Sequence, residues 1–184
     1  MVYFIGAGPG DVDLITVKGR NILSSADVVI YAGSLVSAEH MTFCKEDAVI
    51  HNSASMTLEE VIEVMRKAHI ENKNVVRLHT GDPAIYGAIK EQMDELDKLS
   101  IDYSIVPGVS SFSAAASVIK KEFTLPSVTQ TLILTRVEGR TPVPETEDLE
   151  KLASVGASMA IFLSISMIDK VVAKLKAGYG RNVP

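Results

Sequence analysis

The segment Gly6-Ala7-Gly8-Pro9-Gly10-Asp11 has the residue types of a loop whose backbone binds a phosphate or another polar ligand. A dinucleotide-binding G-x-G-x-x-G pattern would need glycine where Asp11 stands, and Pro9 lacks the backbone N–H that a phosphate cradle uses. The carboxylate of Asp11 would also lie next to the pyrophosphate. These departures disfavour a dinucleotide site, and the segment predicts either a tight turn or a loop whose backbone approaches some other ligand.

A second segment, Thr80-Gly81-Asp82-Pro83, joins an apolar run to a helical pattern. Asp82 before Pro83 is typical of a helix N-cap followed by proline at the first helical position. In the alternative interpretation, Gly81 lets a ligand approach the backbone, and Asp82 accepts a hydrogen bond from an ammonium or hydroxyl group. The sequence leaves both interpretations open.

A third segment, Pro107-Gly108-Val109-Ser110-Ser111, presents two hydroxyl groups after a turn. It is similar to the start of a nucleophile elbow, but Phe112 stands where a second glycine is needed. The 4 histidines have no metal-ligand spacing, and Cys44 is the single cysteine. Serine hydrolysis, metal catalysis and an internal disulfide are therefore disfavoured, and the two serines are either helix caps or ligand contacts.

Arg136 and Arg140 stand on either side of a short segment after the apolar run Leu132-Ile133-Leu134. Guanidinium groups pair with carboxylates through two parallel hydrogen bonds, so these two residues are candidates for binding an acidic ligand. A solvated loop of mixed charge explains them equally well, because Glu138 and Glu145 lie nearby in the sequence.

Short β-branched or apolar runs alternate with helical patterns, which predicts an α/β fold with a mainly parallel sheet. Ligands of open α/β sheets bind beyond the carboxyl ends of the strands. Five predicted strand ends carry glycine or small polar residues, and we expect them to form one shared site. A capping box of Thr57 and Glu60 is predicted to start one of the helices. The predicted strands are 2–6, 27–32, 48–51, 74–80, 101–106, 131–136 and 158–164, and the predicted helices lie near 13–25, 57–71, 84–98, 110–120, 146–155 and 166–177.

The composition is that of a folded protein, because 47% of the 184 residues are hydrophobic and 22% are charged. The 18 basic and 23 acidic side chains give a net charge of −5, which argues against general binding to nucleic acid or an anionic membrane. We find neither an apolar run of the ~20 residues that span a bilayer nor a signal peptide. A cytoplasmic location is expected.

In this order, the three glycine-bearing segments resemble the signatures of the tetrapyrrole (corrin/porphyrin) methylases, which use S-adenosylmethionine. The first resembles the N-terminal loop of the family, together with Asp13-Leu14-Ile15-Thr16, and the resemblance extends over essentially all 184 residues. Two further segments resemble the branch that methylates C-11 of precorrin-4: residues 31–36 (YAGSLV) and 135–145 (TRVEGRTPVPE).

The resemblance implies methyl transfer to C-11 of precorrin-4 or its cobalt complex in cobalamin biosynthesis, with S-adenosylhomocysteine as the second product. It also implies a homodimer and a two-domain fold with the cofactor in the cleft between domains 1–107 and 108–184. The family's cofactor contacts would fall on Pro9, Gly81, Asp82, Ile85, Ser110, Ser111 and Leu163. The tetrapyrrole would be bound by Gly8, Gly10, Asp11, Arg136 and Arg140. No metal ligand is implied, and the general base is unassigned.

Members of the family continue beyond the position of Pro184, so we expect the C-terminal domain to be incomplete in this sequence. Several alternatives stay open. The chain could methylate a different ring carbon or, as a diphthine synthase, a protein; in other classes it could be a nicotinamide-dependent oxidoreductase or a non-catalytic binding module. Thermal stabilisation by S-adenosylhomocysteine or by NAD(P) would distinguish these classes.

Overall fold

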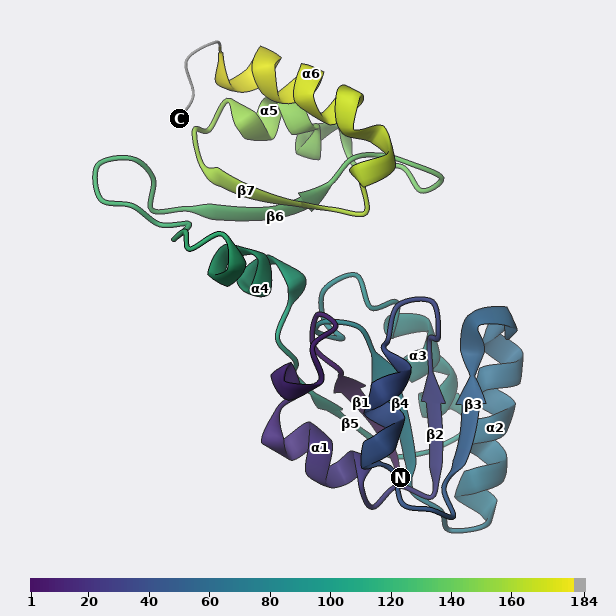
Figure 1. Cartoon of the computed structure of the whole chain (residues 1–184). Coiled ribbons are helices and arrows are strands. Elements are labelled where there is room, and N and C mark those ends of the chain that lie inside the picture. The colour runs from purple at the N-terminus through teal and green to yellow at the C-terminus, as the bar shows by residue number, and fades with distance from the viewer. Residues whose placement is uncertain (181–184) are drawn as a thin grey trace. The chain divides into compact units, whose positions relative to one another are not determined.

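The computed structural model describes residues 1–180, and the chain divides into two compact units. Unit 1 comprises Met1–Ala115, and unit 2 begins at Ala116 (Figure 1). The division falls within helix α4 (Ser111–Val118). The domain boundary near Pro107 stays a prediction.

Unit 1 contains a five-stranded sheet in the order β3-β2-β4-β1-β5, with every pair of neighbours parallel. The predicted α/β fold with a mainly parallel sheet is therefore confirmed. All five strands lie within a residue or two of their predicted bounds: β1 (Val2–Gly6), β2 (Val28–Tyr31), β3 (Val49–Asn52), β4 (Val75–His79) and β5 (Tyr103–Val106).

Helix α2 (Leu58–Ile70) begins at the predicted capping box. The Thr57 hydroxyl accepts from the backbone N–H of Glu60 at 3.3 Å, and the Glu60 carboxylate accepts from the N–H of Thr57 at 2.8 Å. Helix α1 (Val17–Leu23) starts four residues later than predicted, because a 3-10 turn at Val12–Leu14 precedes it and Thr16 caps it.

The helix predicted for 84–98 is shorter than expected, since α3 covers only Lys90–Lys98. Tyr86 and Ala88 have φ angles of 54° and 49°, in the left-handed region that breaks a right-handed helix. Residues between Pro83 and the start of α3 therefore form turns.

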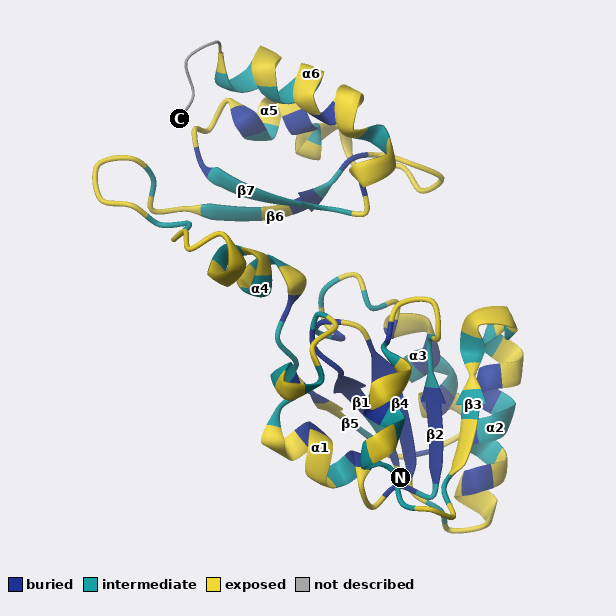
Figure 2. Cartoon of the chain, in the orientation of Figure 1, coloured by how far each residue is buried: buried dark blue, intermediate teal, exposed yellow. Residues whose placement is uncertain are grey.

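Apolar side chains cover both faces of this sheet. The strands β1, β2 and β4 are mostly buried (Figure 2). On one face, Phe4 and Ile30 pack against α2 and α3 through residues such as Met65 and Leu96. On the other face, a second cluster of strand residues packs against α1 and the segment that follows β2; it includes Ile5, Val29, Val76, Leu78, Leu23 and Val36. The central strands β1, β2 and β4 are thus buried on both sides, as expected for parallel strands.

Unit 2 has two parallel strands, β6 (Leu132–Arg136) and β7 (Ser158–Phe162), and helices α5 (Leu149–Ala153) and α6 (Ile168–Tyr179). Its apolar cluster contains the buried residues Val137, Leu149 and Val171, with half-buried neighbours such as Met159 and Ile161. Within residues 1–180, no helix has both the length and the apolar character that crossing a membrane requires.

Candidate functional site

Three glycine-bearing loops of unit 1 meet at the carboxyl edge of its sheet. Gly8 and Gly81 form an antiparallel bridge, in which Gly81 N–H donates to Gly8 O at 2.7 Å and Gly8 N–H donates to Gly81 O at 3.3 Å. A Cβ atom on Gly6 would lie 2.5 Å from Gly81 O and 2.6 Å from the Cα of Gly108. Contacts this close admit only glycine, so the three segments form one cluster. That the ends of the two strands of unit 2 share this site stays a prediction.

The position of this cluster in the sheet is that of a ligand site. β1 and β4 are neighbours, but the helix after β1 packs on one face of the sheet and the helix after β4 packs on the other. Open α/β sheets bind their ligands at the point where the chain leaves two neighbouring strands toward opposite faces of the sheet.

Asp82 joins two of these loops. One carboxylate oxygen accepts from the backbone N–H of Ala84 at 2.8 Å, and the other accepts from the N–H of Gly108 at 2.9 Å. The predicted helix cap at Asp82 is wrong, because the residues after Pro83 form a turn and α3 begins only at Lys90. The side chain instead ties the loop after β4 to the loop after β5.

Gly81 has a φ angle of 60°, and the atoms nearest to a Cβ placed there would be the Cα of Ser110 at 3.8 Å and the N of Ser111 at 3.9 Å. The backbone of Gly81 is therefore free of close neighbours on its Cβ side. Ser110 is buried and Ser111 is exposed. Four predicted cofactor residues, Gly81, Asp82, Ser110 and Ser111, are thus brought together, while Pro9 and Ile85 lie half-buried in the flanking loops.

The predicted tetrapyrrole contacts in unit 1 lie on the first loop. Gly8 is buried with a φ angle of 82°, whereas Gly10 and Asp11 are exposed. The Asp11 carboxylate accepts from the N–H of Asp13 at 3.0 Å and so caps the 3-10 turn that follows. Neither Gly10 nor Asp11 is held by the bridge, which leaves the tip of the loop available to a ligand.

His40 lies in this region, and the sequence predicted no role for it. The histidines were considered as metal ligands, and no ligand spacing was found. His40 is fully buried, and its Nε2 lies 2.9 Å from the carbonyl oxygen of Ala7, while Nδ1 lies 3.1 Å from that of Ser37. The peptide group that carries Ala7 O also carries the N–H of Gly8, which donates to Gly81. His40 therefore fixes the plane of the peptide that joins the first two loops.

Two basic side chains of β4, Arg77 and His79, are buried on the face covered by α2 and α3. Burial, with a smaller contribution from Arg77, lowers the pKa of His79 from 6.5 to about 3, so its imidazole is neutral at physiological pH. Its ring lies 5.9 Å from that of Phe4, and Nε2 has no hydrogen-bond partner among residues 1–180. A period-two pattern in the sequence does not show which face of a strand is buried. The burial of these two polar side chains follows only from the pairing of the strands in the folded sheet.

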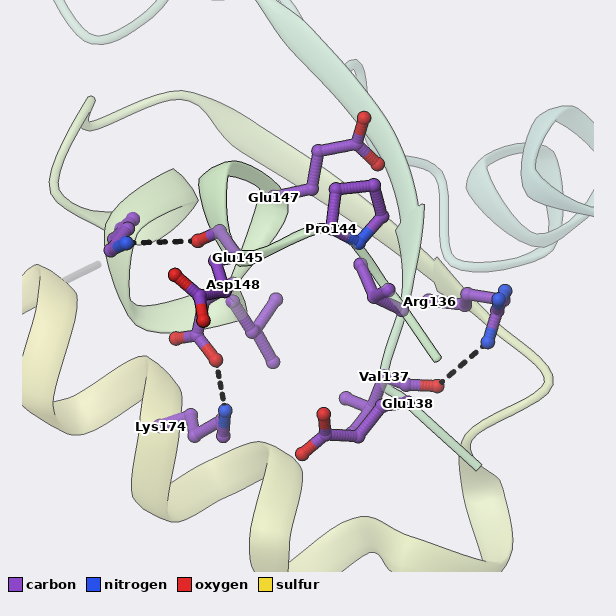
Figure 3. Close-up of a pocket in the computed structure, with 11 residues that line it drawn as sticks. Arg136, Val137, Glu138, Pro144, Glu145, Glu147, Asp148 and Lys174 are labelled. Carbon is purple, nitrogen blue, oxygen red and sulfur yellow. Dashed lines mark hydrogen bonds and ion pairs between the residues drawn. The ribbon is translucent and has the colours of Figure 1, made fainter. Parts of the chain in front are cut away.

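The predicted site residues of unit 2 gather at the carboxyl ends of β6 and β7. Arg136 lines a cavity of about 250 Å³ (Figure 3), and its guanidinium donates to the carbonyl oxygens of Thr141 at 3.0 Å and Pro142 at 2.9 Å. Arg140 is exposed in the same loop. Arg136 therefore closes its own loop, and the binding of substrate carboxylates by Arg136 and Arg140 stays a prediction.

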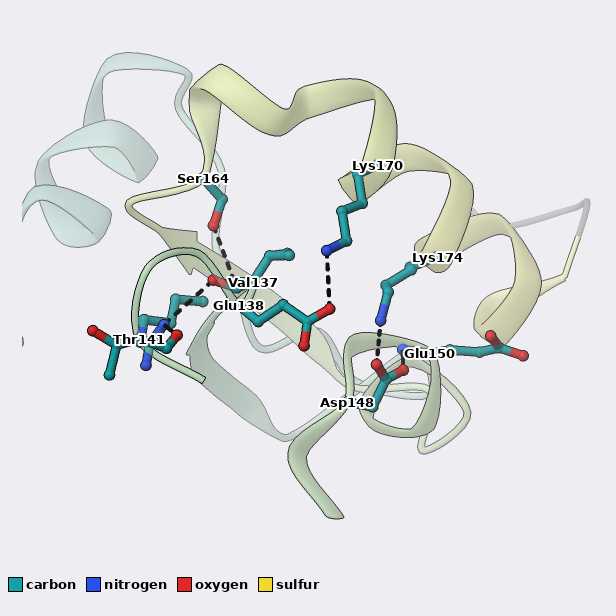
Figure 4. A network of polar contacts seen from close by, with 9 residues as sticks. Val137, Glu138, Thr141, Asp148, Glu150, Ser164, Lys170 and Lys174 are labelled. Carbon is teal, nitrogen blue, oxygen red and sulfur yellow. Dashed lines mark hydrogen bonds and ion pairs between the residues drawn. The ribbon is translucent and has the colours of Figure 1, made fainter. Parts of the chain in front are cut away.

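Leu163 follows β7 with a φ angle of 54°, and 71% of its surface is exposed. The buried Ser164 accepts from the N–H of Val137 at 3.0 Å and so joins the ends of the two strands (Figure 4). The role of Leu163 in cofactor binding is likewise a prediction. Among the residues that the structure describes, no group of three or more His, Cys, Asp and Glu side chains could hold a metal ion.

Comparison with known proteins places this geometry in context. A model of the family described as Tetrapyrrole (Corrin/Porphyrin) Methylases matches residues 1–184. The Cobalt-precorrin-4 C(11)-methyltransferase of Methanocaldococcus jannaschii is 58% identical over 184 residues, which cover 100% of this chain and 71% of that protein. The protein of the same name from Priestia megaterium is 51% identical over 100% of this chain and 71% of its own length.

Two solved structures are similar to the chain. The X-ray structure of the cobalt precorrin-4 methyltransferase CbiF has a TM-score of 0.94 and 51% identity, and the match covers 98% of this chain and 76% of that one. The uroporphyrin-III C-methyl transferase from Thermus thermophilus complexed with S-adenyl homocysteine has a TM-score of 0.74 and 25% identity, covering 98% of this chain and 73% of that one.

Proposed function

Because this chain belongs to the tetrapyrrole (corrin/porphyrin) methylase family, we propose that it transfers a methyl group from S-adenosylmethionine to C-11 of precorrin-4 or cobalt-precorrin-4 in cobalamin biosynthesis. The observation that carries the C-11 assignment is the identity to the two cobalt-precorrin-4 C(11)-methyltransferases along the whole chain. The structure crystallised with S-adenyl homocysteine supports the choice of cofactor.

The glycine cluster of unit 1 fits a cofactor of this kind. A side chain at Gly81 would project toward Ser110 and Ser111, so the absence of one leaves room for a ligand against backbone and hydroxyl groups. We propose that Gly81, Asp82, Ser110 and Ser111 hold the cofactor, together with Pro9, Ile85 and Leu163. Gly8, Gly10, Asp11, Arg136 and Arg140 are proposed to bind the tetrapyrrole.

When bound, S-adenosylmethionine supplies an electrophilic methyl group on a sulfonium. The task of the protein is then to orient two reactants and to exclude water, which needs neither a metal nor a covalent intermediate. Effective molarities from orientation can lower a barrier by about 7–11 kcal/mol. Backbone held by the Gly8–Gly81 bridge and by Asp82 is rigid, so the contacts it offers are set before the reactants bind.

Substitution Gly81→Val tests the cofactor assignment. The branched side chain would enter the ligand space, and overpacking at a cost of about 1–3 kcal/mol corresponds to binding of S-adenosylhomocysteine weaker by about 5- to 150-fold. Titration calorimetry on a variant with a native circular dichroism spectrum measures this. Gly139→Val is the control, because Gly139 has no neighbour within 4 Å of its Cβ position. Unchanged affinity in folded Gly81→Val would remove Gly81 from the site.

The reaction itself is tested by incubating the protein with methyl-labelled S-adenosylmethionine and a panel of corrinoid precursors, followed by mass spectrometry. We expect label in precorrin-4 or cobalt-precorrin-4, at C-11. Label in a different intermediate would overturn the position while leaving the family unchanged. Stabilisation by NAD(P) and not by S-adenosylhomocysteine would instead favour an oxidoreductase.

We extend the proposal to a homodimer in the cytoplasm. The biosynthetic role of the family supports the cytoplasmic location. The homodimer is implied only by the resemblance to the family. Light scattering tests it, with an expected mass twice the 19.8 kDa of one chain. A mass of one chain at all concentrations would contradict the dimer.

A further inference from the structure

Arg77 is a buried cation that has no acidic partner among residues 1–180. Only 9% of its surface is exposed, and its hydrogen-bond acceptors are neutral groups. Nε donates to the Gln92 amide oxygen at 3.2 Å, and Nη1 donates to the Ser53 hydroxyl at 3.0 Å and to the carbonyl of Ile30 at 3.4 Å. No ion pair joins Arg77 to a carboxylate within residues 1–180, and its Nη2 makes none of the hydrogen bonds found there.

The charge on Arg77 persists despite its burial. Burial lowers the pKa of Arg77 to about 10, which still leaves the guanidinium protonated at physiological pH. Its neighbour His79 is neutral there, since its pKa lies near 3. An uncompensated buried charge is costly to a fold, and a site that retains one is a candidate for binding an ion of opposite charge.

The guanidinium lines an open cavity of about 280 Å³ at the carboxyl edge of the sheet. Ser53 follows β3, Ala88 precedes α3, and the first turn of α2 forms the apolar wall. Glu91 is the acidic residue of the lining, and it makes no ion pair with Arg77. The complete lining is Ser53, Met56, Thr57, Leu58, Val61, Arg77, Ala88, Glu91 and Gln92.

We propose that this cavity is a carboxylate-binding site, in which Nη2 of Arg77 donates to the carboxylate and the apolar wall accepts a short alkyl arm. A hydrogen bond from a guanidinium to a carboxylate is charge-assisted, which makes it stronger than one between neutral groups. The arm can come from the tetrapyrrole substrate or from a free short-chain carboxylic acid, and the first source rests on the proposed function. All of the lining belongs to unit 1.

The melting temperature alone does not test the role of Arg77. Arg77→Met takes the donor from three acceptors, which destabilises the fold, and removes a buried unpaired charge, which stabilises it, whether or not a ligand binds. The test is therefore ligand binding by folded variants. Arg77→Lys retains the charge without the planar fork and gives a second variant.

The test uses the full chain and three probes: uroporphyrin III as a stable polycarboxylated tetrapyrrole, sodium propionate and sodium phosphate. We expect Arg77→Met to weaken uroporphyrin binding, followed by the Soret band, by about 10- to 100-fold, as for a lost charge-assisted hydrogen bond. Arg77→Lys should lie between Arg77→Met and the wild type. Arg66→Met is the matched control, because Arg66 lies on α2 and pairs with Glu63 at the surface.

The outcomes separate the possibilities. Weaker uroporphyrin binding with normal binding of S-adenosylhomocysteine supports a substrate arm as the occupant. Unchanged uroporphyrin affinity, with thermal stabilisation by propionate lost in Arg77→Met, supports a free carboxylic acid. Folded Arg77→Met that binds both probes like the wild type overturns the site, as does a preference for phosphate over propionate. Failure of the wild-type chain to bind S-adenosylhomocysteine would count against the proposed function and not against this cavity.

Discussion

The two units of the chain differ in how they hold their predicted site residues. In unit 1, the loops are held by direct contact between their backbones. Gly6, Gly81 and Gly108 lie so close together that a Cβ atom on Gly6 would not fit. Apolar clusters pack on both faces of the sheet that carries these loops. In unit 2, the loop after β6 is held by the guanidinium of Arg136 and by the hydroxyl of Ser164, over a small apolar cluster.

The difference bears on the roles proposed for the two sets of loops. Contacts set by a rigid, buried sheet are precise, which suits the orientation of a reacting group. A two-stranded sheet is marginal on its own and depends on the helices packed against it. Exposed, charged loops on such a unit suit the recognition of a large polar substrate, where side chains can adjust.

The largest expected effect is that of Gly6→Ala. Its new Cβ would lie 2.5–2.7 Å from backbone atoms of Gly81 and Gly108, which cannot move independently of the sheet. We expect the free energy of unfolding of unit 1 to fall by about 3 kcal/mol, the upper part of the overpacking range. Amide hydrogen exchange of β1 and β4 measures it.

Gly139→Ala in unit 2 is the control for Gly6→Ala. No atom lies within 4 Å of its Cβ position, so its effect should stay within about 0.5 kcal/mol. If Gly6→Ala and Gly139→Ala lowered the free energy of unfolding equally, the proposed difference between the loops of the two units would be wrong.

The next effect is acid sensitivity confined to unit 1. The imidazole of His79 has a pKa of about 3 in the folded state against 6.5 in the unfolded state, so between these values only the unfolded state binds the proton. The stability is complete above pH 6.5, and as pH falls it should decrease by about 1.4 kcal/mol per unit of pH. Urea unfolding or amide exchange of β4 between pH 7 and 5 tests this.

His79→Leu should remove most of that slope. All 4 histidines precede Ala116, so the β6 and β7 amides should be insensitive to pH over the same range. A slope that His79→Leu leaves unchanged would assign the acid sensitivity to another group.

The smallest effect concerns the ion pair of Asp148 and Lys174 in unit 2 (Figure 4). The hydrogen bond from Lys174 lowers the pKa of Asp148 below 3.8, so the pair stabilises the fold above that pH and its contribution is lost as pH falls further. Asp148→Asn keeps an N-cap for α5, and should cost up to about 1 kcal/mol at pH 7 and progressively less as the pH falls below 3.8.

Exchange rates of the β7 amides at pH 7 and pH 3 measure this effect. Glu147→Gln serves as the control, since it changes an exposed carboxylate one position away. The same loss at pH 3 as at pH 7 would mean that the cap, and not the ion pair, carries the stability.

Local patterns predicted the elements of this chain well. Seven strands and the capping box of α2 were found where β-branched runs and the Thr57–Glu60 spacing placed them. The error at α3 is instructive, because Asp82-Pro83 has the residue types of a helix start. Tyr86 and Ala88 adopt left-handed φ angles, which their residue types do not predict.

The sequence by itself determined the α/β alternation, the family signatures and which loops carry glycine, because these depend on residue types close together in the chain. Tertiary structure alone decided that Gly6 touches Gly108, that His40 holds the peptide of Ala7, and that Arg77 is buried without an acid. Each of these joins residues far apart in sequence, and the physical reason is that strand order and the choice of sheet face, which no local pattern encodes, set which side chains meet.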